Sequence, residues 1–351
     1  VVHALTVKGK GYMFAENDPE RFHGTGSFDA RTGKVSKPTA GRSNSAVFGE
    51  AMCELAEKDK RIAAITAAMP SGTGLSEFAL RYPERFFDCG IAEANMMGVA
   101  AGLAASGKIP FASTFAMFAA GRAYEIVRNS IGYPHLNVKI GATHAGISVG
   151  EDGATHQCNE DIALMRTIPG MTILNPADDV EARAAVKAAI EMEGPVYLRF
   201  GRLAAPIFND PETYQFEIGK GITLREGKDV TLVATGLMVS EALDAAEQLA
   251  ADGISARVLN IHTIKPLDVD LIAKAAAETG LLITVEEHSI IGGLGAAVAE
   301  AVCDTCPVPV VRIGVNDEYG HSGPAVDLLK EFGLCAEHIV EVTKASMVKK
   351  A

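Results

Sequence analysis

The sequence has no surplus of basic residues. Lys and Arg together number 32 against 44 Asp and Glu, which gives a formal net charge of -12 at pH 7. Proteins that bind nucleic acid or anionic membranes non-specifically need cationic patches that face the phosphates. The charge balance therefore argues against both kinds of partner, and we expect neither a nucleic acid nor a membrane.

Long apolar runs are also missing. The longest, residues 96–105, is soon followed by Gly107, Lys108 and Pro110, which is too short for a membrane span. No basic segment followed by an apolar one opens the chain, as a secretory signal would require. These absences favour a cytoplasmic location. The chain starts at Val1 without an initiator Met, and residues 1–7 resemble a strand already under way. We therefore expect a fragment or a processed product.

Cysteine is scarce and scattered. Of the six cysteines, only Cys303 and Cys306 have a metal-like spacing, and no second pair completes a zinc site. Reduced structural thiols are the expectation, and no metal site is predicted on this chain.

What is present predicts two α/β domains. The 351 residues, 48% of them hydrophobic, can form more than one core. Residues 8–41 are rich in turn formers and predict a linker. After that, strand patterns alternate with helical ones, which predicts parallel sheets covered by helices. The predicted strands of the first domain are residues 61–66, 110–113, 137–142, 171–174 and 196–200, and its helices are 46–58, 95–105, 120–131 and 180–192.

A polar connection, Asn-Asp-Pro-Glu at residues 209–212, marks the boundary to a smaller second domain. The same alternation then resumes. Its predicted strands are residues 229–234, 256–261, 281–286 and 308–313, and its helices are 239–252 and 294–303. The predicted fold class is α/β, with two domains built on mainly parallel sheets.

One acidic residue stands where ligands bind in such folds. Glu93 lies in Asp-Cys-Gly-Ile-Ala-Glu-Ala-Asn, residues 88–95, at a predicted strand-to-helix junction. Ligands of open α/β sheets bind at the carboxyl ends of the strands, where these junctions lie. A carboxylate at a helix start is also favoured by the helix dipole alone. Taken by itself, Glu93 is compatible with either role.

A second polar cluster follows the predicted strand 137–142. Thr143 and His144 precede the run Gly-Glu-Asp-Gly-Ala-Thr-His-Gln at residues 150–157, which includes Asp152 and His156. So many glycines and polar groups serve no packing purpose, and ligand-binding residues concentrate on such loops. Histidine is suited to hydrogen bonding and proton transfer near neutral pH. No spacing in this loop matches a known metal motif.

Aromatic and guanidinium side chains provide further candidates. Phe118 lies just past the predicted strand 110–113 and is placed either in the core or against a flat heterocycle. Arg42, Arg122 and Arg202 are candidate phosphate ligands, because guanidinium binds phosphate through two bonds. Each of them is equally compatible with an ordinary surface position.

In combination and in order, these motifs resemble the transketolase family over residues 40–345. The first half resembles the pyrimidine-binding domain, and the second half resembles the family's C-terminal domain. The matching runs are Ile-Ala-Glu-Ala-Asn-Met-Met-Gly at 91–98, Ser-Thr-Phe at 113–115, Thr-His at 143–144, the loop 150–157, Ile-Lys-Pro-Leu-Asp at 264–268, Val-Glu-Glu-His at 285–288 and Gly-Gly-Leu-Gly at 292–295. The resemblance divides the chain into residues 1–41 (end of a diphosphate-binding domain and linker), 42–208 and 215–346.

The resemblance implies a role for each candidate. Glu93 would hydrogen-bond the aminopyrimidine of thiamine diphosphate and favour the imino tautomer that deprotonates the cofactor's own thiazolium carbon. Phe118 would stack on the pyrimidine, with Phe115 and Ile91 nearby. Contacts to the sugar hydroxyls and carbonyl would come from His144, Asp152 and His156. Arg42 and Arg202 would hold the substrate phosphate, whereas Arg122 aligns with the family only after a one-residue gap.

The first 40 residues resemble a close relative, 1-deoxy-D-xylulose-5-phosphate synthase. The runs concerned are Lys-Gly-Lys-Gly-Tyr at 8–12, Ala-Glu-Asn-Asp-Pro at 15–19 and Phe-His-Gly at 22–24. In either family a histidine like His23 reaches the active site. The synthase usually has Asp-Arg where this chain has Thr143-His144. This difference favours ketol transfer between phosphosugars over the synthase reaction, which condenses pyruvate with glyceraldehyde 3-phosphate in isoprenoid and thiamine precursor synthesis.

One family motif is missing. The Gly-Asp-Gly and later Asn that hold Mg²⁺ in the diphosphate-binding domain do not occur in this sequence. The resemblance therefore implies a complementary diphosphate-binding domain or subunit, in a homodimer or heterotetramer, without which the chain is inactive. Two other readings stay open. One is the β subunit of a 2-oxoacid dehydrogenase, which the loop 150–157 disfavours. The other is a regulatory or assembly subunit without activity.

Overall fold

The computed structural model describes residues 1–19, 21–23, 28–35 and 43–350. The chain divides into two compact units, residues 1–41 and 42–351. In the described part of the chain, no helix is both long and apolar enough to cross a lipid bilayer.

The first unit is small and held together by aromatic side chains. It contains α1 (Met13–Asn17) and a two-residue antiparallel pairing of β1 (Phe28–Asp29) with β2 (Lys34–Val35). The Tyr12 ring lies 5.5 Å from those of both Phe14 and Phe22. Residues 1–7 form no strand, so that prediction is wrong. Their apolar side chains are exposed and have no sheet to join.

The first sheet of the second unit has seven strands in the order β12-β7-β8-β6-β5-β3-β4. All pairings are parallel except that of β12 with β7. Alanine and isoleucine are the most frequent residues of the buried central strands, as expected of a sheet covered on both faces. The strands are β3 (Ile62–Thr66), β4 (Phe86–Asp88), β5 (Ile109–Phe115), β6 (Lys139–Ala145), β7 (Thr172–Leu174), β8 (Val196–Gly201) and β12 (Thr263–Lys265).

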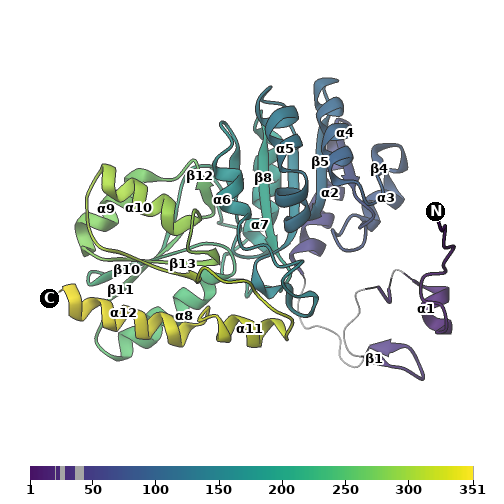
Figure 1. Cartoon of the computed structure of the whole chain (residues 1–351). Helices are drawn as coiled ribbons and strands as arrows, with labels where there is room; N and C mark the ends of the chain where they lie inside the picture. The colour runs from purple at the N-terminus through teal and green to yellow at the C-terminus, as the bar shows by residue number, and fades with distance from the viewer. Residues whose placement is uncertain (20, 24–27, 36–42, 351) are drawn as a thin grey trace. The chain divides into compact units, whose positions relative to one another are not determined.

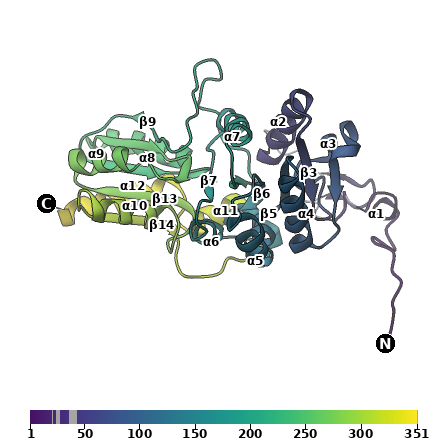
Figure 2. The same ribbon diagram turned by 90° about the horizontal axis from the view of Figure 1, so that it is seen from above.

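Helices cover both faces of this sheet. The pair α2 (Asn44–Lys58) and α7 (Asp179–Glu191) lies on one face, and α4 (Glu93–Ala105), α5 (Tyr124–Ile126) and α6 (Asp161–Arg166) lie on the other (Figure 2). Side chains cap the N-terminal ends of α2 and α7. Ser43 Oγ accepts a hydrogen bond from the Ala46 amide, and Asp178 Oδ1 accepts one from the Glu181 amide. The short helices α3 (Ser76–Arg81) and Pro83–Arg85 lead into β4.

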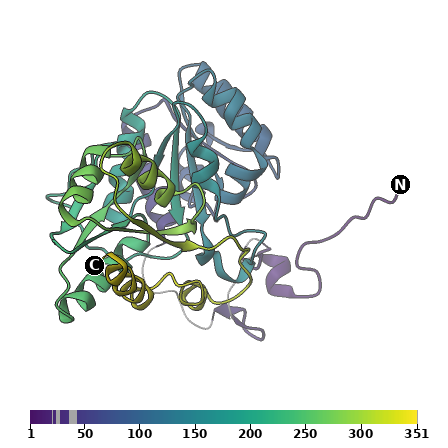
Figure 3. The ribbon, with the colours of Figure 1, turned by 60° about the vertical axis from the view of Figure 1, so that its left-hand side comes forward.

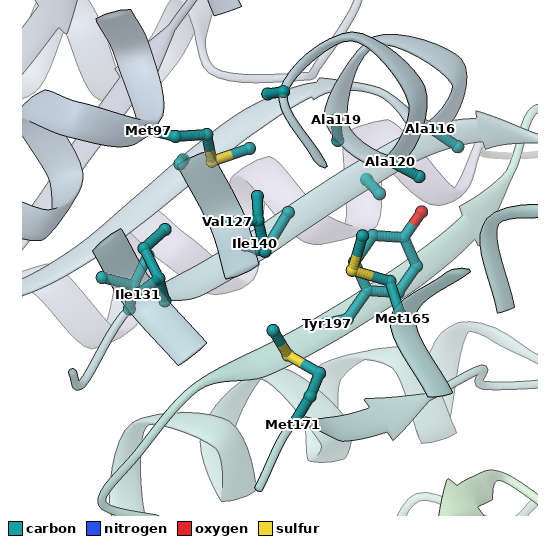
Figure 4. Packing of buried hydrophobic residues seen from close by; sticks show 14 of the residues in the cluster. Met97, Ala116, Ala119, Ala120, Val127, Ile131, Ile140, Met165, Met171 and Tyr197 are labelled. Atoms are coloured by element: carbon teal, nitrogen blue, oxygen red, sulfur yellow. The ribbon is translucent and has the colours of Figure 1, made fainter. Parts of the chain in front are cut away.

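The core on the α4 side contains many small side chains. Alanines of residues 116–123 pack with Met97, Met165, Met171 and Tyr197 around Ile140 (Figure 4). The single helix predicted over residues 120–131 is wrong in form. Two π-helical segments, Met117–Arg122 and Val127–Gly132, flank the short α5. Such π-helical turns occur frequently at functional sites.

The second sheet has five strands in the order β14-β13-β10-β11-β9, all parallel except β9. In Figure 1, α9 and α10 lie above it and α8, α11 and α12 below it, and Figure 3 brings this part to the front. The elements are β9 (Ile222–Arg225), β10 (Val230–Ala234), α8 (Met238–Ala251), β11 (Ala256–Asn260), α9 (Val269–Thr279), β13 (Leu282–Ser289), α10 (Leu294–Asp304), β14 (Val310–Val315), α11 (Ala325–Glu331) and α12 (Ala336–Lys350).

The prediction of two α/β domains with mainly parallel sheets is confirmed. The two sheets belong to one compact unit, because β12, which follows β11 in the chain, pairs with β7 of the first sheet. The loop that follows β6 contacts the second sheet's side, where Gln157 Nε2 donates to the His321 carbonyl at 3.0 Å.

Candidate active site

Glu93 is the first residue of α4 and is almost completely buried, with 2% of its surface exposed. A buried carboxylate needs a partner, because desolvation strongly disfavours an isolated charge. The partner is Arg122, whose Nη1 donates to Glu93 Oε1 at 2.8 Å. The same guanidinium lies over the ring of Phe118, with its central carbon 4.4 Å from the ring centroid.

Flat rings gather beside this ion pair, at the carboxyl ends of β5 and β6. Phe115 and Phe118 are stacked with centroids 6.1 Å apart and planes at 14°. His144 stacks on Phe115 at 3.9 Å, and His156 meets Phe118 edge-on at 5.3 Å. The π-helical turn after β5 brings Phe118 back over the strand end. This arrangement offers planar apolar faces next to a carboxylate, which suits a heteroaromatic ring with hydrogen-bonding nitrogens.

His144 is held in an unusual conformation. Its φ of 57° lies in the left-handed region, which a non-glycine residue seldom adopts outside functional sites. Its Nδ1 lies 3.1 Å from Thr143 Oγ1. Burial, and then the nearby Arg202 and His156, lower the pKa of His144 to about 3. The ring is therefore neutral at physiological pH and can take part in hydrogen bonding without carrying charge.

The loop between the two histidines carries Asp152. It begins with Gly146, forms the short helix Ile147–Asp152 and returns at Cys158, whose carbonyl accepts the Gly146 amide at 2.9 Å. Asp152 is exposed to solvent. A cavity of about 640 Å³ is lined by Phe118, Arg122, Thr155 and Glu160 and, from the second sheet's side, by residues 317–320.

Two family models match the chain. The transketolase pyrimidine-binding domain matches residues 41–207, and the transketolase C-terminal domain matches residues 219–339. A protein of Methanocaldococcus jannaschii, provisionally named a transketolase C-terminal section, is 48% identical over 305 residues, which are 86% of this chain and 96% of that protein. The chain belongs to the transketolase family.

Other transketolase-family relatives differ in length. The 6-deoxy-6-sulfo-D-fructose transketolase subunit of Clostridium sp. strain MSTE9 is 46% identical over 293 residues, covering 84% of this chain and 91% of its own. The 1-deoxy-D-xylulose-5-phosphate synthase 1 of Geobacter sulfurreducens is 43% identical over 355 residues, covering 100% of this chain and 55% of its own. The chain thus spans about half the length of the synthase it matches.

Solved structures agree with this membership. One of them is described as a split-gene transketolase in an inactive β4 tetramer. It is 51% identical and has a TM-score of 0.82, and the match covers 88% of this chain and 99% of that one. Transketolase from Leishmania mexicana, at 23% identity and a TM-score of 0.73, shares the fold and is covered over 47% of its length. Members of this family are thiamine-diphosphate-dependent transferases, and this chain corresponds to part of one.

The structure brings several of the predicted transketolase site residues together. Glu93, Phe115, Phe118, His144 and His156 converge at one end of the first sheet. Ile91 lies just before α4 and is largely exposed.

The predicted phosphate ligands are arranged differently from one another. Arg202, just past β8, donates through Nη1 to the Val149 carbonyl and to Glu151 at 3.2 Å, so it braces the loop. Arg122 is half exposed and forms an ion pair with the buried Glu93. Arg42 lies outside the described residues. His23 is exposed and belongs to the first unit. Its catalytic role stays a prediction.

The structure also contains a buried ionic network that the sequence analysis does not predict. Asp161 Oδ2 accepts Arg199 Nε at 2.8 Å and the Tyr197 hydroxyl at 2.9 Å. Arg199 Nη2 also donates to the backbone carbonyl of Glu287, on β13, at 2.8 Å. The signal was present in the sequence. Arg199 interrupts an apolar strand, and Glu286-Glu287-His288 ends another, so these charges had to be buried with partners.

Proposed function

We propose that this chain supplies the cofactor-activating half of a transketolase that transfers a two-carbon ketol unit between phosphosugars. The observation that carries the proposal is the buried Glu93 carboxylate beside the stacked Phe115 and Phe118 rings. A carboxylate next to flat apolar faces fits the aminopyrimidine half of thiamine diphosphate. When bound, this cofactor supplies a carbon nucleophile for the ketose carbonyl.

The residues of this chain would divide the remaining tasks. Glu93 would hold a proton at the pyrimidine ring nitrogen, and Phe118 would stack on the ring, with Phe115 and Ile91 beside it. His144, neutral at working pH, and His156 would hydrogen-bond the sugar carbonyl and hydroxyls, and Asp152 would do so from the loop. Catalysis by such groups depends on their fixed positions relative to the substrate.

The substrate phosphate would be bound by Arg42 and Arg202, and His23 would reach the site from the first unit. Arg202 already contacts Val149 and Glu151 through Nη1, so the fork of its guanidinium can take a phosphate only with its other nitrogens.

Arg122 has a distinct place in this scheme. Its guanidinium makes the two contacts that an aminopyrimidine would make, an ion pair with Glu93 and a stack on Phe118. Arg122 and the cofactor would therefore compete for the same surfaces, and Arg122 must turn outward when the cofactor binds. Its side chain is half exposed, so water can take over the solvation of the guanidinium.

The diphosphate and Mg²⁺ would be bound by a complementary domain or subunit. Within the part of the chain that the structure describes, no group of three or more His, Cys, Asp or Glu could hold a metal ion. The sequence has no Gly-Asp-Gly motif. Split-gene and C-terminal-section relatives support a partner subunit. We further propose residues 1–41 as the end of a diphosphate-binding domain and linker, 42–208 as the pyrimidine-binding domain and 215–346 as the C-terminal domain. We also propose a homodimeric or heterotetrameric enzyme and a cytoplasmic location.

A substrate panel tests the proposal. The chain is mixed with its complementary subunit, thiamine diphosphate and Mg²⁺, and is given either xylulose 5-phosphate with ribose 5-phosphate or pyruvate with glyceraldehyde 3-phosphate. Ketol transfer with the first pair is the expected result. Carbon dioxide release with the second pair, and no transfer with the first, would assign the chain to the synthase reaction, which the synthase relatives keep as the alternative.

A further inference from the structure

The loop of residues 146–157, here called the substrate loop, has a short helix and hydrogen bonds of its own, but its three glycine turns leave much of its shape to other contacts. Gly146, Gly150 and Gly153 all have φ near +80°, and glycine backbones are the most costly to order. The substrate loop nevertheless carries Asp152 and His156, which the proposed function places against the sugar. Its conformation therefore has to be set by contacts from outside.

Arg202 of the first domain supplies one of these contacts, and Glu287 of the C-terminal domain supplies another. The Ser148 amide donates to Glu287 Oε1 at 2.7 Å, between residues 139 apart in the sequence. The Glu287 carboxyl also lies directly over Gly146, where a Cβ would come within 2.3 Å of Oε1. Gly146 thus leaves room for the carboxylate, and the carboxylate fixes the first turn of the loop. Hydrogen bonds to a buried charged acceptor are among the stronger ones in proteins.

Glu287 is itself held firmly. It lies on β13, just after residues 282–285, which are paired with β10 on one side and β14 on the other. Its backbone carbonyl accepts Arg199 Nη2 at 2.8 Å, and Arg199 is anchored by Asp161. The side chain is 3% exposed; burial raises the pKa of the Glu287 carboxyl, and the nearby Arg199 charge and the Ser148 amide act to lower it.

Two further contacts from the same domain act on the same loop. Gln157 Nε2 donates both to the Ile147 carbonyl inside the loop and to the His321 carbonyl of the C-terminal domain, at 3.1 and 3.0 Å. Gly153 approaches Ser322 so closely that a Cβ would come within 2.5 Å of its hydroxyl. The C-terminal domain thus contacts the start, the middle and the end of the substrate loop.

We infer that Glu287 is a positioning residue, through which the C-terminal domain sets the substrate loop and thereby the places of Asp152 and His156. The effect on catalysis rests on the proposed function, but the effect on the loop does not. Glu287 touches no reacting atom in this scheme. It acts through the Ser148 amide.

Glu286 provides a matched control. It is the preceding residue on β13 and is also fully buried. Its two oxygens accept the amides of Leu294 and Gly295 at 2.6 and 2.8 Å, at the start of α10 in its own domain. Removing this carboxylate should destabilise α10 and leave the substrate loop in place.

The test is hydrogen–deuterium exchange on the full chain, with Glu287→Leu, Glu287→Gln and Glu286→Leu compared with wild type. Glu287→Leu should speed amide exchange across residues 146–157 by about tenfold or more, because the buried acceptor is lost. Glu287→Gln keeps an acceptor and should restore most of the protection. Glu286→Leu should speed exchange at residues 294–304 and leave 146–157 unchanged. Unchanged exchange at 146–157 in Glu287→Leu would overturn the inference. So would equal loosening of that segment in Glu286→Leu.

Kinetics on the reconstituted enzyme supply the second readout. Glu287→Leu should lower kcat/KM by about 10²-fold, the effect of a misplaced positioning group, with Glu287→Gln in between and Glu286→Leu near wild type. If Glu287→Leu does not fold, Glu287→Gln decides the matter, since it should still loosen the loop and lower kcat/KM measurably. If wild type itself transfers no ketol unit while Glu287→Leu loosens the loop, the proposed function fails and the loop assignment stands.

Discussion

The buried pair of Asp161 and Arg199 gives a prediction whose size follows from the structure. Arg199 is 2% exposed and Asp161 is fully buried. Arg199→Met leaves the buried Asp161 carboxylate with the Tyr197 hydroxyl as its one side-chain donor among the described residues. Removing one partner of a buried ion pair costs about 3–5 kcal/mol, so the free energy of unfolding should fall by that amount.

The double variant separates the charge from the packing. Asp161→Asn combined with Arg199→Met removes both charges, and replacing a whole buried pair by neutral groups is often nearly neutral. What remains is Glu287, whose carbonyl loses the Arg199 donor at a cost of about 1 kcal/mol and whose buried carboxyl loses a neighbouring positive charge. The double variant should therefore be more stable than Arg199→Met alone, with a total loss of about 1–2 kcal/mol.

Urea unfolding followed by circular dichroism measures these differences, since the chain has no tryptophan for fluorescence. The exposed pair Arg81–Glu77, four residues apart on α3, is the control, and Arg81→Met should cost about 0.5 kcal/mol or less. A loss below about 1 kcal/mol for Arg199→Met, or a double variant as unstable as the sum of its single variants, would refute the reasoning.

Three further results are expected. Gly146→Ala should destabilise the chain by about 1–3 kcal/mol from its φ of 84° and ψ of -169° alone. Contact of the new Cβ with Glu287 should add to this loss of stability. Gly146→Ala should therefore cost more than Gly90→Ala, whose Cβ would meet nothing within 4 Å. Equal losses of stability in thermal unfolding would contradict the close contact. Arg122→Met should raise the affinity of the reconstituted enzyme for thiamine diphosphate in calorimetry, because it removes the group on Glu93, and a lower affinity would show that Arg122 aids binding instead. Of the nine histidines, three should show no titration in NMR spectra between pH 8 and 5, because loss of hydration lowers their pKa to about 3 or 4: His144, His262 and His288. In the unfolded chain these rings take up protons below about pH 6.5. Each therefore lowers the free energy of unfolding as the pH falls from there toward the ring's folded-state pKa. Titration of the folded protein near pH 6.5 would contradict the presence of these rings in neutral form.

The sequence predicts the central strands well, because their signal is local. Residues 62–66, 109–115, 196–201 and 230–234 are apolar runs between turn formers, and the predicted positions differ from the observed ones by a few residues at most. The helices that pack on them, such as α7 and α8, were predicted from apolar residues at helical spacing. Short edge strands β4, β9 and β12 were missed, because they have few buried residues or depend on a partner strand elsewhere.

The site could be predicted only as far as it follows strand ends. Glu93 was predicted from its place at a strand-to-helix junction, and the loop 150–157 from its glycines and polar groups, whereas the family resemblance alone placed them and His144 in one site. The contact of Glu287 with Ser148 could not be predicted, because it joins residues far apart in the sequence and in different domains. The ion pair of Arg122 with Glu93 depends on the π-helical form of residues 117–122, for which the run of small residues gives no local signal.

Activation of the cofactor by Glu93 is the central claim, and deuterium exchange at the thiazolium carbon tests it most directly. The reconstituted enzyme is incubated in heavy water and quenched, and proton NMR measures how fast the cofactor loses its signal at that carbon. Glu93→Gln keeps the size of the side chain but cannot exchange a proton with the pyrimidine ring. Exchange should slow by about 10²-fold or more in this variant, the usual contribution of a positioned acid–base group. Exchange within a few-fold of wild type, with the cofactor bound, would contradict the account.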